Sequence, residues 1–189
     1  MPPSKNATGR LCVAFLRGVG GPRPAAGDAL RACLGAAGYD PVRPVMATGN
    51  VVFGLGRKRR APDEAAMSAL IEAHFGYPLP AILRSGAAVT GMVDDDPFRG
   101  VDKEKLTRFV ALLAADAPPA DAFPEPGRDA GYRLVERRER DLLLVIDRSL
   151  VRTPDLMAVL ERAFRKRITT RNWNTMEKVA AAVAAVPEG

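Results

Sequence analysis

The feature that most constrains the fold is an apolar run near the N-terminus that has no polar face. Leu11 to Leu16 reads Leu-Cys-Val-Ala-Phe-Leu and stops at Arg17-Gly18. Alternate side chains of a β-strand point to opposite faces of the sheet, so both faces of this strand are apolar. A sheet with one face in water shows polar residues at every second position. The run therefore predicts a sheet that is covered on both faces, most simply by a second unit of the same protein.

Turn and helix patterns divide the first half of the chain in a β-α-β-β-α-β order. Gly38 is placed to end a helix whose apolar residues recur every three to four positions. Thr48-Gly49 is typical of a hairpin turn between two strands. Ser85 is suited to cap a short helix after the last strand. The predicted elements are a strand at 11–16, a helix at 24–37, strands at 41–47 and 50–55, a helix from 62, a strand at 79–83 and a short helix at 86–93.

The second half repeats this order, although the sequences of the two halves are not alike. Asn50 and Asp141, and likewise Arg84 and Arg171, stand at matching places in the two halves. A Pro- and Ala-rich stretch at 117–126 replaces the first helix. Because a βαββαβ unit is the ferredoxin-like motif, we predict an α+β protein of two ferredoxin-like units packed together, with mainly antiparallel sheets. The predicted parts are a disordered lead-in at 1–9, an N-terminal unit at 10–96 and a C-terminal unit with the final helix at 97–189.

The composition excludes several classes of function. Hydrophobic residues make up 47% of the chain and charged residues 26%, which is typical of a folded domain. No apolar run approaches the roughly 20 residues of a membrane span, and residues 1–10 lack the core of a signal peptide, so we expect a cytoplasmic protein. Catalysis of the Ser-His-Asp or Cys-His type would depend on His74, the single histidine. With Cys12 and Cys33 as the two cysteines, we expect no metal and no cofactor.

Two polar segments lie at the ends of predicted strands. Between 170 and 175 the chain reads Thr-Arg-Asn-Trp-Asn-Thr, where a short strand gives way to the final helix. The Arg171 guanidinium fits a phosphate or carboxylate, but Arg171 and Asn172 are equally suited to brace and cap the helix. Between Gly18 and Pro24 a glycine-rich loop leads into a helix, where free N–H groups favour anions. Tight turns explain the same glycines.

These segments resemble those of a known family. Leu16-Arg17-Gly18 with Gly20-Gly21, Thr48-Gly49-Asn50-Val51-Val52-Phe53, Leu83-Arg84-Ser85 and Arg171-Asn172-Trp173-Asn174-Thr175 are similar to segments of the DUF1697 family, in family order. The resemblance extends from residue 11 to residue 180. It implies a bacterial, cytoplasmic α+β protein, and because the biochemistry of the family is not established, it assigns no catalytic residue.

We expect a non-enzymatic module that binds a small anionic ligand, a nucleotide or a nucleic-acid segment at the seam between the two units. This expectation rests on Gly, Arg and Asn residues gathered at strand ends, in a chain with no usable catalytic constellation. The sequence leaves the oligomeric state undetermined. The predicted ligand-binding residues are Arg17, Gly18, Gly20, Gly21, Asn50, Arg84, Arg171, Asn172, Trp173 and Asn174.

Two other functions stay open at this point. The first is an enzyme that stabilises an anionic substrate through Arg, Asn and backbone amides, with an acid such as Asp147 as its base. The second is an RNA-binding sheet of the RRM kind, in which Phe15 and Phe53 stack on bases. The second function requires both rings to be exposed, so their solvent accessibility distinguishes it from a packed core.

Overall fold

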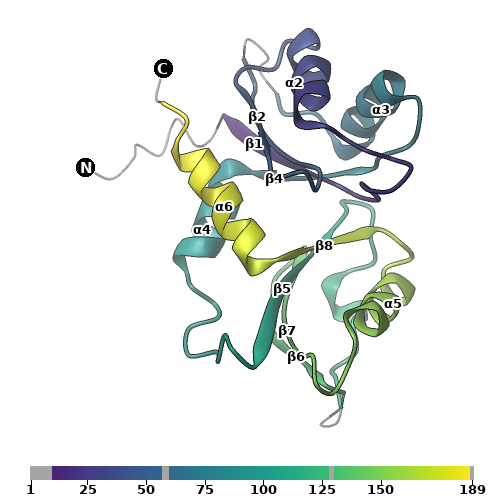
Figure 1. The fold of residues 1–189 in the computed structure, drawn as a ribbon, viewed down its shortest axis with the longest axis vertical. Coiled ribbons are helices and arrows are strands. Elements are labelled where there is room, and N and C mark those ends of the chain that lie inside the picture. The colour runs from purple at the N-terminus through teal and green to yellow at the C-terminus, as the bar shows by residue number, and fades with distance from the viewer. Residues whose placement is uncertain (1–9, 57–59, 128–129, 188–189) are drawn as a thin grey trace. The chain divides into compact units, whose positions relative to one another are not determined.

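The computed structural model describes residues 10–56, 60–127 and 130–187 (Figure 1). The predicted lead-in at 1–9 lies outside the described residues. Within them the chain divides into two compact units: unit 1 extends to Asp94 and resumes at Glu177, and unit 2 is Asp95–Met176. The elements are β1 (Leu11–Leu16), α2 (Gly27–Ala36), β2 (Val42–Val45), β3 (Asn50–Gly54), α3 (Glu64–Phe75), β4 (Ala81–Ser85), α4 (Gly86–Asp94), β5 (Leu106–Leu113), η1 (Ala120–Ala122), β6 (Tyr132–Arg137), β7 (Asp141–Asp147), α5 (Thr153–Ala163), β8 (Ile168–Asn172) and α6 (Trp173–Ala184).

The sheet of unit 1 has the strand order β2-β3-β1-β4, and every neighbouring pair is antiparallel. The hairpin between β2 and β3 turns at Met46 to Gly49, where Gly49 has a φ of +73°. This is the turn that Thr48-Gly49 predicts. The apolar run of the first strand becomes the central strand β1, and all six of its side chains are buried.

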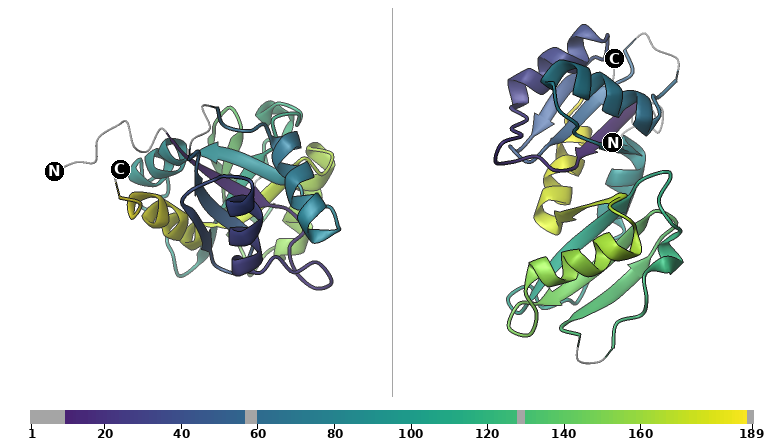
Figure 2. Two further views of the ribbon diagram at one scale, coloured as in Figure 1. Left: turned by 90° about the horizontal axis from the view of Figure 1, so that it is seen from above. Right: turned by 90° about the vertical axis from the view of Figure 1, so that its right-hand side faces the viewer.

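Helices α2 and α3 cover one face of this sheet, as Figure 2 shows from the side. Leu30 and Leu34 of α2 and Met67 and Ile71 of α3 pack on the even-numbered residues of β1. Asp63 caps α3 by accepting a hydrogen bond from the Ala66 N–H at 2.6 Å. Both helices therefore form where the apolar periodicity predicts them.

The other face of the same sheet receives helix α4. A Cβ on Gly86 would lie 3.1 Å from Leu11 Cβ and 3.0 Å from Val183 Cγ1, so α4 packs closely on β1 and α6 at this glycine. The sequence analysis left this face for the second unit. Unit 1 itself supplies at least part of the cover, because α4 follows β4 directly and folds back over the sheet.

The sheet of unit 2 has the order β6-β7-β5-β8, again with antiparallel neighbours throughout. Helix α5 packs through Leu156 and Leu160 on one face. No α-helix stands between β5 and β6 in the described residues; that stretch contains the short helix η1, and Phe123 enters the core beside it. The predicted absence of a regular helix at 117–126 is confirmed.

The registers of the central strands β1 and β5 with their neighbours correspond residue by residue, whereas the β6–β7 pair has a register shift between Leu134 and Glu136 that the β2–β3 pair lacks. Val13 lies opposite Arg84 as Val110 lies opposite Arg171. Phe15 pairs with Asn50, and in the same way Leu112 pairs with Asp141. The matching positions of Arg84 with Arg171 and of Asn50 with Asp141 are therefore confirmed.

The α+β class with mainly antiparallel sheets is confirmed. The described residues form two four-stranded antiparallel sheets and five α-helices. Among those helices, none combines the length and the apolar content that crossing a membrane demands. The two compact units differ from the predicted parts in two respects: unit 2 begins at Asp95 instead of residue 97, and residues from Glu177 onward group with unit 1. The predicted domain boundaries themselves stay a prediction.

Candidate functional site

The loop that follows β1 is shaped by glycines. Gly18, Gly20 and Gly21 have φ values of +77°, +131° and +54°, a region that residues with a Cβ rarely adopt. All three are exposed, and a Cβ on Gly20 or Gly21 would have no neighbouring atom within 4 Å. The backbone conformation, rather than lack of space, therefore requires glycine in this loop.

A tight reversal returns Arg23 to the start of the loop. The N–H of Gly20 donates to Arg23 O, and the N–H of Arg23 donates to Gly20 O, both at 3.0 Å. Gly21 and Pro22 form the tip between them. As a result, Arg23 Nη1 lies 4.0 Å from the position that a Cβ of Gly18 would occupy. The guanidinium thus stands beside the backbone of Gly18.

Both ends of the loop are held by unit 1. The Arg17 N–H donates to Pro80 O at 2.8 Å, next to β4. At the other end, the Tyr77 hydroxyl donates to Pro24 O at 2.5 Å. These bonds anchor the loop to the rest of unit 1 where it leaves β1 and where it turns toward α2.

Three backbone donors of this loop remain available. Within the described residues, the N–H groups of Gly18, Val19 and Gly21 donate to no protein acceptor. Arg23 is exposed and forms no ion pair with any residue of the described ranges. N–H groups beside a guanidinium attract an anion, because both present positive charge to the same place. We call residues 17–23 the glycine loop.

Asn50 has a structural role in the neighbouring turn. It is fully buried, and its amide nitrogen donates to Val45 O at 3.1 Å and to Thr48 Oγ1 at 2.9 Å. The two bonds account for the two N–H groups of the amide. Asn50 therefore holds the β2–β3 turn, which lies against the glycine loop because a Cβ on Gly49 would be 2.6 Å from Val19 Cγ2.

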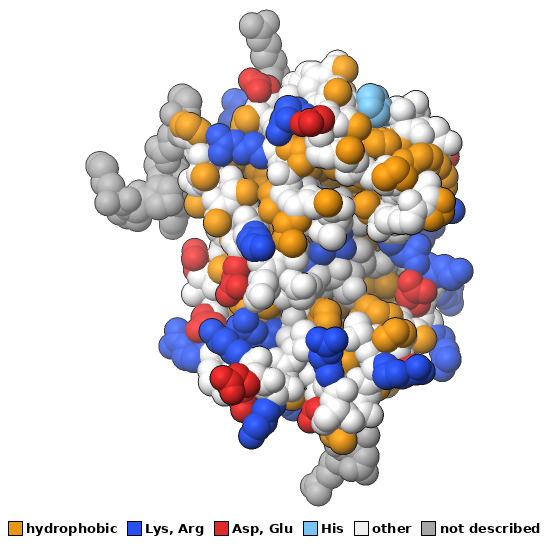
Figure 3. All heavy atoms as spheres, viewed as in Figure 1, with side chains coloured by type: hydrophobic (Ala, Val, Ile, Leu, Met, Phe, Trp, Pro, Cys, Tyr) orange, Lys and Arg blue, Asp and Glu red, His pale blue; other side chains and the backbone are white. Residues whose placement is uncertain are grey.

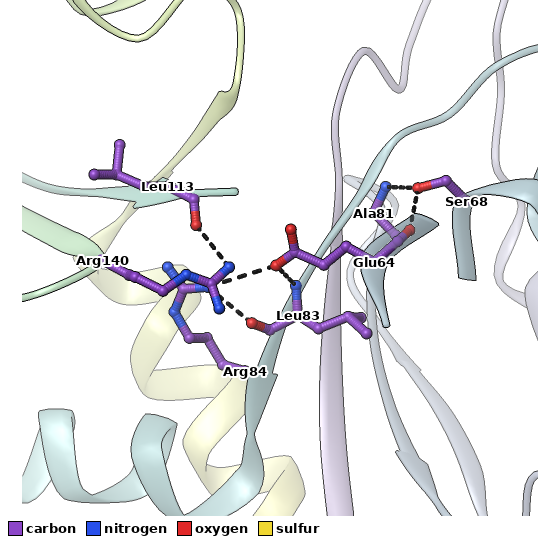
Figure 4. A network of polar contacts seen from close by, with 7 residues as sticks. All are labelled: Glu64, Ser68, Ala81, Leu83, Arg84, Leu113 and Arg140. Atoms are coloured by element: carbon purple, nitrogen blue, oxygen red, sulfur yellow. Dashed lines mark hydrogen bonds and ion pairs between the residues drawn. The ribbon is translucent and has the colours of Figure 1, made fainter. Parts of the chain in front are cut away.

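Arg84 belongs to a polar network between α3 and β4 (Figure 4). Its Nη1 donates to Leu83 O at 2.8 Å and lies 4.0 Å from Glu64 Oε1. The same carboxylate accepts from the Leu83 N–H at 2.9 Å, and Ser68 Oγ accepts from the Ala81 N–H at 2.9 Å. Side chains of α3 thereby satisfy N–H groups of β4, which lies at the edge of its sheet.

Arg171 stands in unit 2 at the place that matches Arg84. Its Nη1 donates to Thr169 Oγ1 and to Thr170 O, both at 2.8 Å. Burial lowers the pKa of Arg171 to about 10 from 12.5, because a desolvated guanidinium is harder to keep charged. Like Arg84, it donates to the carbonyl of the preceding residue, so the two halves hold their arginines in the same way.

Asn172 caps the final helix, as the sequence suggested. Its Oδ1 accepts from the Thr175 N–H and from Thr175 Oγ1, both at 2.8 Å. Ser85 does the same for α4 by accepting from the Ala88 N–H at 3.1 Å. The prediction that Asn172 and Ser85 are helix caps is confirmed.

Trp173 is part of the core of unit 2. It is 2% exposed and packs edge to face against Phe98, with the two ring centres 4.9 Å apart. The guanidinium carbon of Arg108 lies 6.0 Å from the Phe98 ring centre. Asn174, by contrast, is exposed on the first turn of α6. The indole is enclosed by protein and offers no open surface for stacking.

The structure gathers one part of the predicted site in unit 1. Arg17, Gly18, Gly20 and Gly21 form one loop, and the turn that Asn50 holds lies against it. The sequence analysis missed Arg23. The pattern Gly20-Gly21-Pro22 could have revealed it, because a two-residue turn at Gly-Pro places the residue after Pro22 back beside the residues before Gly20.

Asp147 is held by its own turn. Its Oδ1 accepts from Ser149 Oγ at 2.5 Å and from the Ser149 N–H at 2.9 Å. The bond from the Ser149 hydroxyl and then the bond from the backbone lower the pKa of Asp147 below 3.8. A carboxylate of lowered pKa is a weaker base, so this geometry argues against Asp147 as the base of an enzyme.

The RRM-like arrangement is contradicted by the side-chain directions. Phe15 and Phe53 are both 0% exposed. Phe53 pairs with Cys12, so it lies on the face of the even-numbered residues of β1, whereas Phe15 points to the opposite face. Two rings on opposite faces of a sheet cannot stack on one strand of RNA.

Basic and acidic side chains both lie on the face of each unit that is drawn in Figure 3. Lys and Arg side chains there alternate with Asp and Glu side chains. Several arginines are paired, such as Arg138 with Asp95 at 3.1 Å and Arg152 with Asp155 at 3.1 Å. Such pairing offsets part of the positive charge on which broad, unspecific nucleic-acid binding depends.

Comparisons with known proteins give a family and a fold. The family described as "Protein of unknown function (DUF1697)" matches residues 10–136. No curated protein matches the chain. A solved structure described as "The structure of conserved bacterial protein SP0830 from Streptococcus pneumoniae" is similar at a TM-score of 0.65 and 14% sequence identity. The match covers 93% of this chain and 98% of that one, and at this identity it shows the fold alone.

Proposed function

The chain belongs to the DUF1697 family, whose function is unknown, and we propose from its described residues that it is a binding module for a small anion. The glycine loop is the binding site in this proposal. One observation carries it: in this loop the N–H groups of Gly18, Val19 and Gly21 have no acceptor among the described residues, and Arg23 Nη1 lies 4.0 Å from the Cβ position of Gly18. The same loop contains four of the residues that the sequence analysis predicted to bind a ligand.

The donor set favours a phosphate or sulfate group. A tetrahedral anion has several oxygens, each of which accepts hydrogen bonds from different directions. Backbone amides from Gly18, Val19 and Gly21 supply single donors, and Arg23 supplies a planar fork of them. Because the two ends of the loop are bonded to Pro80 and to Tyr77, the loop loses less conformational freedom on binding than an unanchored loop would.

Arg84, Asn172 and Trp173 have local structural roles in this proposal. Their bonds and burial support helix capping, edge protection and core packing. The desolvated guanidinium of Arg171 would gain most from a nearby negative charge, so a ligand contact at Arg171 and Asn174 stays a prediction.

The proposal also keeps the ferredoxin-like description for each unit. The order β2-β3-β1-β4, with α2 and α3 on one face, supports it for unit 1. The matching order β6-β7-β5-β8 supports it for unit 2, where η1 stands in place of the first helix. A bacterial, cytoplasmic setting remains our expectation, and a small phosphorylated metabolite is a ligand that such a setting supplies.

Titration calorimetry with inorganic phosphate tests the proposal. We expect saturable binding that Arg23→Ala weakens about 10- to 100-fold, because a hydrogen bond to a charged group contributes about 1.5–3 kcal/mol. Arg31→Ala is the matched control: it removes an equal charge from unit 1, where Arg31 pairs with Asp28 at 2.7 Å. The control should bind phosphate like the unaltered protein.

Amide NMR locates the binding. Phosphate should shift the N–H resonances of Gly18, Val19 and Gly21 more than those of the rest of the chain. If phosphate binds nowhere, or binds without moving these three resonances, the glycine loop is not the site and the proposed function is wrong.

A further inference from the structure

Three aromatic side chains gather at the end of α3. The His74 ring packs edge to face on the Phe75 ring, with the centres 5.1 Å apart, and the Phe75 ring centre lies 5.9 Å from that of Tyr77. Among the described residues, every other pair of contacting rings includes at least one buried ring. Here His74 is exposed and the other two rings are half-buried. We call these three residues the aromatic shelf.

Two hydrogen bonds place the shelf beside the glycine loop. The Tyr77 hydroxyl donates to Pro24 O at 2.5 Å, and Pro24 directly follows Arg23. At the other end of the loop, the Arg17 N–H donates to Pro80 O at 2.8 Å. The segment from Tyr77 to Pro80 is therefore bonded to both ends of the glycine loop, and the shelf lies at the end that contains Arg23.

The shelf is anchored to unit 1. Gly76 ends α3 with a φ of +77°, and its N–H donates to Glu72 O at 2.8 Å. Phe75 and Tyr77, on either side of Gly76, pack against the core of unit 1. Figure 3 shows hydrophobic side chains gathered below the single histidine, which is drawn in pale blue. The three rings therefore present a fixed and partly exposed aromatic surface.

We infer that the ligand of the glycine loop is a mononucleotide, whose phosphate binds the loop and whose base stacks on the aromatic shelf. The inference rests on the proposed function, because the loop must first bind the phosphate. Every nucleic-acid base has a flat π-face that stacks on aromatic side chains. The exposed imidazole of His74 also has ring nitrogens that can hydrogen-bond the polar edge of a base.

The spacing of the two features favours a ligand with two separate ends. The available N–H groups belong to Gly18, Val19 and Gly21, whereas the shelf is bonded to the chain at Pro24. The chain from Gly21 to Pro24 can span at most about 11 Å. In a mononucleotide the ribose separates the phosphate from the base, so both ends can be in contact at once. Inorganic phosphate would leave the shelf uncovered.

Calorimetry with three probes tests the inference: inorganic phosphate, ribose 5-phosphate and adenosine 5′-monophosphate. We expect the first two to bind with similar affinity. Adenosine monophosphate should bind about tenfold more tightly than ribose 5-phosphate, because stacking a base on a protein ring produces a gain of this size.

Two variants each remove one ring of the shelf. His74→Ala deletes an exposed side chain, so the variant is expected to fold. Phe75→Leu removes the aromatic ring and keeps an apolar side chain against the core. Each should remove most of the preference for adenosine monophosphate. Phe109→Leu is the matched control and should keep the preference, because Phe109 is also half-buried against a core but belongs to unit 2.

The single histidine gives a separate measurement. Its imidazole proton signals in NMR should shift upfield with adenosine monophosphate, because a stacked base holds these protons over its π-face. With ribose 5-phosphate at the same pH they should not shift upfield.

The failures of the two proposals are distinguishable. If adenosine monophosphate binds no more tightly than ribose 5-phosphate, or if both His74→Ala and Phe75→Leu keep the full preference, the inference is overturned while the proposed function stands. If none of the three probes binds, the proposed function fails and the inference fails with it.

Discussion

The two units build the same sheet but cover it differently. In unit 1, α2 connects β1 to β2 and buries Leu30 and Leu34. In unit 2, the connection from β5 to β6 contains the short helix η1. Phe123 of this connection lies in the core and stacks on Phe164, with the ring centres 6.5 Å apart. The strand order and the register of the central strands β1 and β5 are nevertheless equivalent. Strand pairing therefore fixes the topology, and the cover has only to exclude water.

The irregular β5–β6 connection needs side-chain hydrogen bonds to its backbone that helix α2 does not need. An α-helix satisfies its own backbone groups, whereas an irregular segment leaves carbonyls to be satisfied by other parts of the chain. In unit 2, Arg137 of β6 supplies the donors: it bonds to Ala120 O, to Phe123 O at 3.1 Å and to Glu125 Oε1 at 2.8 Å. Four predictions, ordered by expected effect, test this difference.

The largest expected effect comes from Phe123→Ala. The ring is 1% exposed, and deleting a buried phenylalanine costs about 3–5 kcal/mol of unfolding free energy. Leu34→Ala in α2 is the counterpart in unit 1 and should cost about 2–5 kcal/mol. Urea denaturation measures both. A loss below about 1 kcal/mol for Phe123→Ala would show that the irregular segment is not part of the core.

Arg137→Met should follow, at about 1–3 kcal/mol, because it removes the Arg137 donors from the Phe123 carbonyl and leaves the Ala120 carbonyl with the Phe123 N–H alone. Methionine keeps the apolar stem, so the loss reports the hydrogen bonds. Arg133→Met on the same strand is the control; Arg133 is exposed, and its replacement should change stability by less than about 0.5 kcal/mol. Equal losses for the two variants would contradict the anchoring role.

The two helix caps should behave alike. Asn172→Ala and Ser85→Ala each remove a side-chain oxygen that accepts an N–H of the first turn, and each should cost about 1 kcal/mol in thermal or urea unfolding. A smaller extra loss is expected at Asn172, because it also accepts from the Thr175 hydroxyl. If only one of the two variants lowered the unfolding free energy, the two caps would not have equivalent roles in the two halves.

The smallest expected effect concerns the pKa of Asp147. Ser149→Ala removes the hydroxyl bond that contributes most to lowering it, so the pKa should rise toward 3.8 in a carbon-13 NMR titration. A lowered folded-state pKa adds stability above the unfolded-state pKa, and this stability is lost as the pH falls through the folded-state value. The variant should therefore lose less stability on acidification than the unaltered protein. An unchanged pKa would refute the assignment.

Much of the fold was predictable from local patterns. The run Leu11 to Leu16, the Thr48-Gly49 turn and the capping residue Asn172 each act within a few neighbouring residues. The repeated strand order was predictable as well, because Arg84 and Arg171 stand at the same step of two similar series of elements.

The candidate site was predictable only in part. The glycines pointed to the loop, but the position of Arg23 depends on how the chain reverses at Gly21-Pro22. Asn50 looked like a ligand group, yet its amide is used by Val45 and Thr48. The sequence does not show which groups a polar side chain will hydrogen-bond in the folded protein. Whether that side chain can bind a ligand therefore depends on the residues that pack next to it.

The sequence by itself determined where strands and helices lie, the antiparallel α+β class and the family, because periodicity and turn chemistry act over short distances. Only the tertiary structure decided which polar groups are already bonded, that Phe15 and Phe53 point to opposite faces, and that Arg23 returns beside Gly18. These depend on contacts between residues far apart in the chain. Such contacts exist only after the strands have paired, so no local pattern encodes them.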